Sequence, residues 1–384
     1  KEQMALPRDG TAAQFSMSGV RVGIKDVIDV AGLPTRNGSE AYRDAPPADQ
    51  DAPVVAALRN AGASIIGKTT TTEFAFTDAT NCRNPYDINR TPGGSSSGSG
   101  AAVAAGMVDL ALGTQTAGSL IRPASYCGAV GLKPTYGLLP PLGVTPLALS
   151  FDTLGRIARS IEIATRGFAA MTCGAGTVTE TKDVSAYSGL LQSAAQVDPE
   201  TLQAFHEGSR RLGEIASMFE SGELTVPVND IVTSHRNVMN FEAFRAHGHL
   251  LRDDTVRLLR PKFSAGLRLG GNVSPDEYDF ASICLADTRR EFWERFGSFD
   301  FIITLAVTDG AHLLGETTGF QDWLTVWTVF GGPLISLPWG LDSLGRPKSV
   351  MLAGRPNEDW RLLHVAEKLQ KLAPVMPGPQ LPSI

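Results

Sequence analysis

The sequence predicts an α/β fold, in which one large domain is built on a central mixed, mostly parallel β-sheet covered by helices. The chain has 384 residues, of which 42% are hydrophobic and 19% are charged, so it can bury a large core. Strand-like and helix-like segments alternate in its first third, which is typical of proteins with parallel strands. A glycine-rich segment lies within this alternation and not at a break in composition. We therefore expect a single domain over residues 1–384.

The first elements follow from apolar patterning and from residues that begin and end helices. Residues 20–24 and 64–66 are short β-branched runs that predict strands, and residues 51–60 between them predict a helix. We expect Asp51 to cap this helix, because an aspartate side chain can accept a hydrogen bond from the first free N–H groups. Gly62 is expected to end it.

The glycine- and serine-rich loop that follows is expected to lead into a helix. Residues 98–106 have alanine and valine at helical spacing, and residues 110–113 predict a short buried strand. A second small-residue turn follows at residues 114–122. Both serine clusters would then lie where backbone N–H groups are free to bind a negative charge.

Longer amphipathic segments dominate the second half of the chain. We expect helices at residues 161–171, 199–219, 275–296 and 360–372, and core strands at 301–305 and 334–337. The domain then divides into a core at residues 20–160, a helical elaboration at 160–300, and a return to the sheet with a C-terminal helix at 300–384.

Charge and cysteine content favour small-molecule chemistry. The net charge is −6 and no run of lysine and arginine concentrates positive potential, so we expect no nucleic-acid partner and no membrane partner. The four cysteines are widely spaced without a CxxC pair, which indicates a reduced, cytoplasmic protein. No HExxH or similar pair occurs, and we expect no metal and no cofactor.

Two short motifs match well-known patterns without the structure that these patterns need. Residues 62–69 match the phosphate loop GxxxxGK[ST], but residues 64–66 inside the match are the predicted strand and not an open loop. Residues 94–98 match GxSxG with Ser96 at the centre, but no apolar strand precedes them. Nucleotide hydrolysis and a Ser-His-Asp hydrolase are therefore disfavoured.

A set of longer motifs resembles the amidase signature family. They are GIKDVIDVAG, APVVAALRNAGASIIGKTTTTEFA, NPYD, PGGSSSGSGAAVAAG, ALGTQTAGSLIRPASYCGAVGLKPTYG and, more loosely, GGPLISLPWGLDSLGRP. The similarity is strong over about residues 20–160 and weaker over about 330–372. It implies the fold of that family and the hydrolysis of an amide through an acyl-enzyme without a cofactor.

The resemblance implies a triad of two serines and a lysine. It places the nucleophile at Ser119, a bridging serine preceded by a cis peptide bond at Ser95, and the base at Lys25. A lysine acts as a base only when it is neutral, and burial favours the neutral form. We therefore expect Lys25 to be enclosed by apolar neighbours.

A run of small residues supplies the expected oxyanion hole. The backbone N–H groups of Thr116, Ala117, Gly118 and Ser119 can turn inward together, because small side chains let the chain curve tightly. Such donors stabilise the negative oxygen of a tetrahedral intermediate.

Arg122 is a candidate contact for the substrate. The pattern GTQT followed by S-x-I-R-P-A resembles the malonamidase branch of the family, in which this arginine contacts a substrate carboxylate. The alternative is that Arg122 ties the loop to backbone carbonyls or to an internal acid. The first interpretation predicts a small, carboxylate-bearing amide as substrate.

Two other functions remain open at this point. One is a broad amidase, esterase or carbamate hydrolase, because the triad acylates whatever carbonyl the site presents. The other is the amidase-type subunit of a tRNA-dependent amidotransferase, which works in a complex. Our main expectation is an amidase that acts on a small-molecule amide as a homodimer.

Overall fold

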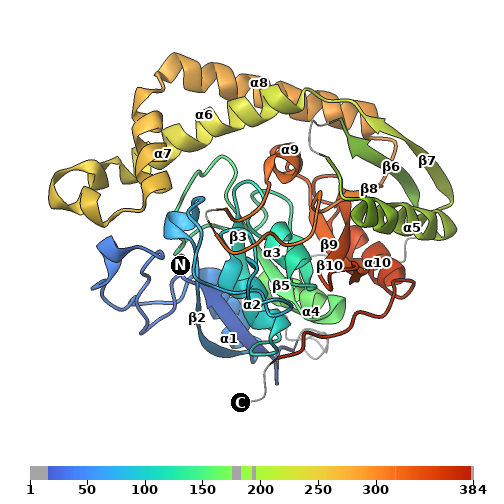
Figure 1. Cartoon of the computed structure of the whole chain (residues 1–384), viewed down its shortest axis with the longest axis horizontal. Coiled ribbons are helices and arrows are strands. Elements are labelled where there is room, and N and C mark those ends of the chain that lie inside the picture. Colours follow the sequence, from blue (N-terminus) through green and yellow to red (C-terminus); the bar gives the residue numbers. More distant parts are fainter. Residues whose placement is uncertain (1–15, 175–182, 193–195, 316, 382–384) are drawn as a thin grey trace.

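A ten-stranded β-sheet runs through the molecule, and helices cover both of its faces (Figure 1). The computed structural model describes residues 16–174, 183–192, 196–315 and 317–381. In this part of the chain the strand order is β2-β1-β3-β5-β4-β9-β10-β8-β6-β7. The strands are β1 (Arg21–Lys25), β2 (Ser64–Thr69), β3 (Leu110–Gln115), β4 (Val130–Lys133), β5 (Thr153–Ala158), β6 (Ser185–Leu191), β7 (Met218–Leu224), β8 (Phe301–Leu305), β9 (Leu334–Leu341) and β10 (Pro347–Gly354).

The sheet is mixed, as expected, but the expectation that it is mostly parallel is wrong. Among the described residues, five of its nine strand pairings are antiparallel, and the four parallel ones lie toward its two ends. Strands β9 and β10, for example, are joined only by residues 342–346. A connection this short can join antiparallel strands, whereas parallel neighbours need a crossover of a dozen or more residues.

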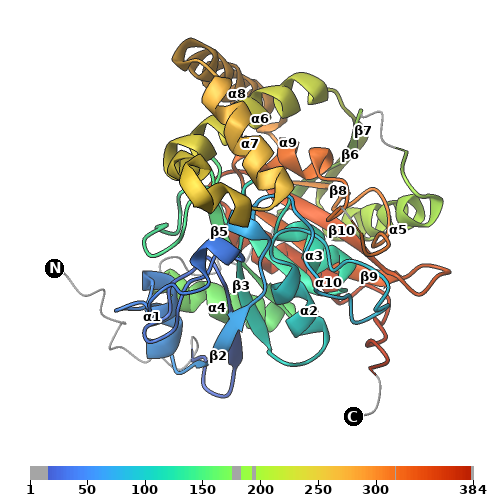
Figure 2. The same ribbon diagram turned by 60° about the vertical axis from the view of Figure 1, so that its left-hand side comes forward.

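The helices form two covering layers and a projecting arm (Figures 1 and 2). They are α1 (Pro53–Asn60), α2 (Ser97–Ala104), α3 (Ile121–Tyr126), α4 (Ile161–Met171), α5 (Pro199–Ile215), α6 (Val228–His247), α7 (Pro261–Asn272), α8 (Pro275–Phe296), α9 (Asp322–Phe330) and α10 (Asp359–Gln370). Short 3₁₀ helices lie at Glu40–Tyr42, Glu73–Ala75, Gly248–Leu251 and Asp253–Leu258. Helices α4, α5 and α10 contact one face of the sheet, and α2 and α3 contact the other.

Helices α6, α7 and α8 form the arm, in which α6 and α8 pack against α9 and Phe263 of α7 stacks on Phe74. In the described residues no helix is both long enough and apolar enough to cross a bilayer.

Several predicted elements occur with the predicted bounds, and others do not. The helices at 161–171 and 275–296 and the strand at 301–305 are α4, α8 and β8. The predicted cap is wrong: α1 has Ala52 at its N-cap, while the Asp51 carboxylate accepts from Arg59 Nε at 2.8 Å. Asp51 is drawn toward this charged partner, and Pro53 at the first helical position needs no cap for its nitrogen.

The region expected to be a helical elaboration, residues 160–300, also contributes strands β6 and β7 to the sheet. Strand β7 lies at the sheet edge and is exposed along most of its length, so it carries no apolar alternation that would reveal it.

The residues that match the phosphate-loop pattern do not form a phosphate loop, as the sequence analysis predicted. Six of its residues, Ser64–Thr69, form strand β2. Gly62 has a φ of +95° and follows the end of α1. No open loop is available there to surround a phosphate.

Candidate active site

The base predicted from the motifs lies at the end of β1, the second strand from one edge of the sheet. Lys25 is the last residue of β1, and Thr114 lies one residue before the end of the neighbouring parallel strand β3. The carboxyl ends of parallel neighbours meet at the same sheet edge. Lys25 Nζ accordingly lies 2.7 Å from Thr114 Oγ1 and 2.6 Å from Ser95 Oγ.

The environment of Lys25 favours the neutral amine. Its side chain is fully buried, and this burial lowers its pKa from 10.5 to about 7, although the charge of Asp152 opposes the shift. Loss of water stabilisation is the cause, since an ammonium is costly in a low-dielectric interior. A substantial fraction of Lys25 is therefore able to accept a proton near pH 7.

Two glycines aim Ser95 at the lysine. Gly93 and Gly94 have φ values of +85° and +60°, a conformation that glycine adopts at low cost. A Cβ atom on Gly94 would lie 2.7 Å from Pro123 Cδ, so no larger residue fits this turn. The described residues contain no cis peptide bond, so the cis bond expected before Ser95 is not present. The two left-handed glycines make the turn instead.

The second serine loop lies directly against the first. The N–H of Ser96 donates to the carbonyl oxygen of Ser119 at 3.1 Å. Ser119 is 7% exposed, against 1% for Ser95, and its hydroxyl makes no hydrogen bond within the described residues. Of the three predicted triad members, Ser119 is thus the one that an incoming molecule can reach.

The carbonyl groups of the loop that precedes Ser119 are hydrogen-bonded to residues outside that loop. The carbonyl oxygen of Thr116 lies 2.8 Å from His235 Nε2, and that of Ala117 accepts a hydrogen bond from the Thr328 hydroxyl. The carbonyl of the next residue, Gly118, accepts from the backbone of the first turn of α3. Three consecutive carbonyl groups are thereby fixed.

Fixing the carbonyl groups also directs the N–H groups of the same peptides. In a planar trans peptide the N–H points away from the C=O, so the N–H groups of Ala117, Gly118 and Ser119 are turned away from these partners. None of the three donates a hydrogen bond within the described residues. They are therefore available to a developing oxyanion.

Asp152 holds the first residue of this loop. Its carboxylate accepts from Thr116 Oγ1 at 2.5 Å and from the N–H groups of Leu147 and Ala148 at 2.7 and 3.0 Å. Burial raises the pKa of Asp152 to about 6, which these hydrogen bonds partly oppose. Asp152 is thus ionised at neutral pH and anchors the loop to residues 147–152.

Arg122 lies beside the same loop. Its Nη1 donates to the carbonyl of Phe320 at 3.0 Å and its Nη2 to Thr318 Oγ1 at 3.2 Å, while its buried Nε has no partner among the described residues. A Cβ atom on Gly118 would lie 3.6 Å from Nη1. Burial lowers the pKa of Arg122 to about 10, which leaves it charged at neutral pH.

Comparison with known proteins identifies the family of the chain. The model of the Amidase family matches residues 2–202. A glutamyl-tRNA(Gln) amidotransferase subunit from Anaeromyxobacter dehalogenans (strain 2CP-C) is 32% identical, over 95% of this chain and 85% of its own. The chain belongs to the amidase signature family. It is an enzyme that acts on carbon–nitrogen bonds of amides.

Solved structures show that the similarity extends over the whole fold. The corresponding amidotransferase subunit from Thermotoga maritima is 25% identical with a TM-score of 0.81, and the match covers 100% of this chain and 90% of that one. A structure described as a vestigial complex that reveals the origins of an s-triazine catabolic enzyme is 27% identical with a TM-score of 0.83, over 92% and 84% of the two chains.

Some residues around the site of this amidase were missed by sequence analysis. Thr114 belongs to the GTQT motif, and its position one residue before the strand end could have indicated it. His235 and Thr328 come from α6 and α9, outside every quoted motif, so no local signal reveals them. Four large aromatic side chains of the C-terminal part of the chain are buried in the core: Trp323, Trp327, Phe330 and Trp339. Within the described residues this amidase has no group of three His, Cys, Asp or Glu side chains placed to hold a metal.

Proposed function

We propose that this amidase hydrolyses the C–N bond of a small amide through an acyl-enzyme on Ser119, with Ser95 as proton relay and Lys25 as base. The 2.6 Å contact between the buried Lys25 Nζ and Ser95 Oγ, beside the loop that carries the more exposed Ser119, supports this assignment. No histidine is needed, because the buried amine is itself the base.

The proton transfers need only Ser119, Ser95, Lys25, the substrate and water. Because the Ser119 hydroxyl has no hydrogen bond among the described residues, its contact with Ser95 Oγ forms when the amide binds. Ser119 Oγ then attacks the amide carbonyl while its proton passes to Ser95 and the Ser95 proton passes to the Nζ of Lys25. The carbonyl oxygen becomes negative and accepts from the N–H groups of residues 117–119. The proton then returns through Ser95 to the leaving nitrogen, the C–N bond breaks, and water repeats the sequence to release the acid.

A substrate panel tests this function on the purified chain. It contains small amides, esters and carbamates, among them propionamide and butyramide with their carboxylate-bearing counterparts malonamate and succinamate. We expect turnover of amides with release of ammonia. Faster hydrolysis of esters or carbamates than of every amide would favour the broader hydrolase, and no turnover of any member would contradict the proposal.

Arg122 is proposed as the contact for a substrate carboxylate. Its charged guanidinium lies beside the oxyanion loop, with Nε unpaired. We expect Arg122→Ala to lower kcat/KM for malonamate and succinamate by about 10- to 100-fold, the worth of a charge-assisted hydrogen bond, and to change that of the neutral amides by less than about 3-fold. Steady-state kinetics on the paired substrates measures this.

Arg122→Lys is the matched control, because it keeps a positive charge without the planar guanidinium. It should retain part of the preference for carboxylate-bearing amides over neutral ones. An equal loss on acidic and neutral amides would assign Arg122 only to holding Thr318 and Phe320. It would also remove the basis for placing the chain in the malonamidase-like branch.

The similarity to amidotransferase subunits favours one second candidate function. Because the amidotransferase subunit from Anaeromyxobacter dehalogenans matches 95% of this chain, the chain could play the same part in a complex. That role predicts glutamine as the substrate and little activity without partner proteins. A purified homodimer that hydrolyses small amides by itself, as judged by light scattering and ammonia release, supports the main proposal and argues against the complex.

A further inference from the structure

We propose that His235 on α6 and Thr328 on α9 are positioning residues that orient the oxyanion loop and so set the turnover rate. Both lie outside the motifs that carry the family resemblance. The His235 side chain contacts the carbonyl oxygen of Thr116, and the Thr328 hydroxyl contacts that of Ala117. The inference rests on the proposed function, because it assigns these side chains to the stabilisation of the intermediate on Ser119.

His235 is built into the interior as a neutral hydrogen-bond donor. It is 3% exposed, and its ring packs on Phe151 with the centroids 4.2 Å apart. Burial lowers its pKa to about 4, so the imidazole is neutral at working pH. A carbonyl oxygen can only accept, and Nε2 must therefore carry the hydrogen that is directed at Thr116.

Thr328 connects the neighbouring peptide to the end of strand β3. Its single hydroxyl hydrogen is shared between the carbonyl oxygens of Ala117 and of Leu324, and its oxygen accepts from Gln115 Nε2, which lies 3.0 Å away. The same Gln115 side chain accepts through Oε1 from the N–H groups of Leu120 and Ile121 at 3.1 and 3.0 Å. The side chain of Gln115, which precedes Ser119 in the chain, thus connects α9 to the residues that follow Ser119.

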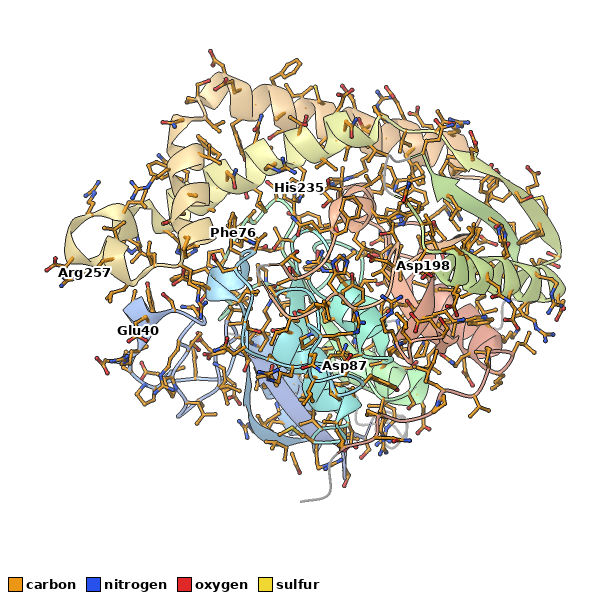
Figure 3. The ribbon with its side chains drawn as sticks, in the orientation of Figure 1. Glu40, Phe76, Asp87, Asp198, His235 and Arg257 are labelled. Carbon is orange, nitrogen blue, oxygen red and sulfur yellow. The ribbon has the colours of Figure 1, made fainter. Side chains whose placement is uncertain are left out.

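The arm keeps the His235 donor in place. Helix α6 is also attached to the segment before β5 through Glu242, which accepts a hydrogen bond from the Ser150 N–H at 3.0 Å. In Figure 3, His235 lies on the side of α6 that faces the rest of the molecule. The position of Thr116 is therefore fixed relative to both the sheet and the arm.

The consequence for catalysis follows from peptide geometry. The C=O of Thr116 and the N–H of Ala117 belong to one rigid peptide unit, so rotation of one misdirects the other. Small residues at positions 117 and 118 offer little resistance to such a rotation. Each lost oxyanion donor typically lowers kcat by about 10²- to 10³-fold.

The test compares His235→Leu with His235→Gln and with the control His247→Leu in the full chain. His247 is matched because it is also buried on α6 and also contacts a backbone carbonyl, but that carbonyl lies outside the oxyanion loop. We expect His235→Leu to lower kcat by about 30- to 300-fold with KM within about 3-fold of the wild type, since the ground-state amide needs the donors less than the intermediate does. His235→Gln, which can still donate, should recover at least about 10-fold of this loss.

A second readout separates positioning from a loss of packing. Phenylboronic acid forms a tetrahedral adduct with a reactive serine hydroxyl, so its inhibition constant should rise in His235→Leu in step with the fall in kcat/KM. Thr328→Val should behave in the same way, and Thr328→Ser should behave like the wild type.

The inference is overturned if His235→Leu and Thr328→Val lower kcat no more than His247→Leu does. It is also overturned if the inhibition constant of phenylboronic acid does not change in them. Failure of the proposed function looks different: Ser119→Ala would then keep both turnover and the boronate adduct, whatever the behaviour of residue 235.

Discussion

Replacement of Ser119 by alanine is expected to lower kcat by about 10⁴- to 10⁶-fold on every amide that the enzyme accepts, the range seen when a catalytic serine is removed. The reason is that the acyl group is transferred to Ser119 Oγ, and no other hydroxyl in the described site is both reachable and next to the oxyanion loop. The fold should be unaffected, because the Ser119 hydroxyl makes no hydrogen bond within the described residues. Steady-state ammonia release and mass spectrometry of the acyl adduct measure the change.

Ser125→Ala is the matched control. Ser125 is also buried on the same stretch of chain, but its hydroxyl donates to the carbonyl of Ile121 within α3 at 2.8 Å. It should keep kcat within about 3-fold of the wild type, since only one local hydrogen bond is lost. Retention of turnover and of an acyl adduct in Ser119→Ala would show that the nucleophile is another residue.

The sequence predicted best where the information is local. Lys25, Ser95 and Ser119 lie within contiguous motifs, and the strand ends and glycine turns that present them are encoded in the same few residues. The structure places Lys25 against Ser95 and the Ser119 loop against Ser96. The assignment of their catalytic roles awaits the kinetic tests.

Sequence analysis failed where distant segments decide the outcome. The antiparallel middle of the sheet depends on which strands pair, and short apolar runs do not carry that information. The Asp51 cap was displaced by a hydrogen-bonded ion pair with Arg59. His235 and Thr328 act on a loop more than a hundred residues earlier in the chain. Only the folded arrangement brings them together.

Lys25 links activity to stability, and this link gives the second large expected effect. Lys25→Met removes the base and should lower kcat by about 10³- to 10⁴-fold. In the wild type, kcat/KM should rise about 10-fold per pH unit below pH 7 and level off above it, because only the neutral amine accepts the proton and its pKa is about 7. A pH–rate profile from pH 5 to 9 measures this. A wild-type profile that falls through pH 7 would contradict the assignment of Lys25 as the base.

The same substitution should stabilise the fold. The pKa of Lys25 is 10.5 when unfolded and about 7 when folded, so between these values the unfolded chain binds more protons and the free energy of unfolding rises with pH. The cost of burying Lys25 is complete below pH 7 and disappears above pH 10.5. The advantage of Lys25→Met over the wild type should therefore shrink by about 2 kcal/mol between pH 7 and pH 9.

Denaturant unfolding of both proteins at the two pH values measures this difference. Lys133, which burial shifts in the same direction, is present in both proteins, so its contribution cancels in the comparison. Asp152, whose pKa of about 6 lies below the window, is ionised at both pH values in the wild type, and its pKa rises in Lys25→Met because the charge of Lys25 is lost. A pH-independent difference would mean that Lys25 keeps its ordinary pKa in the folded enzyme, and a lysine charged at pH 7 could not draw the proton from Ser95. The stability measurement thus tests the catalytic base without any substrate.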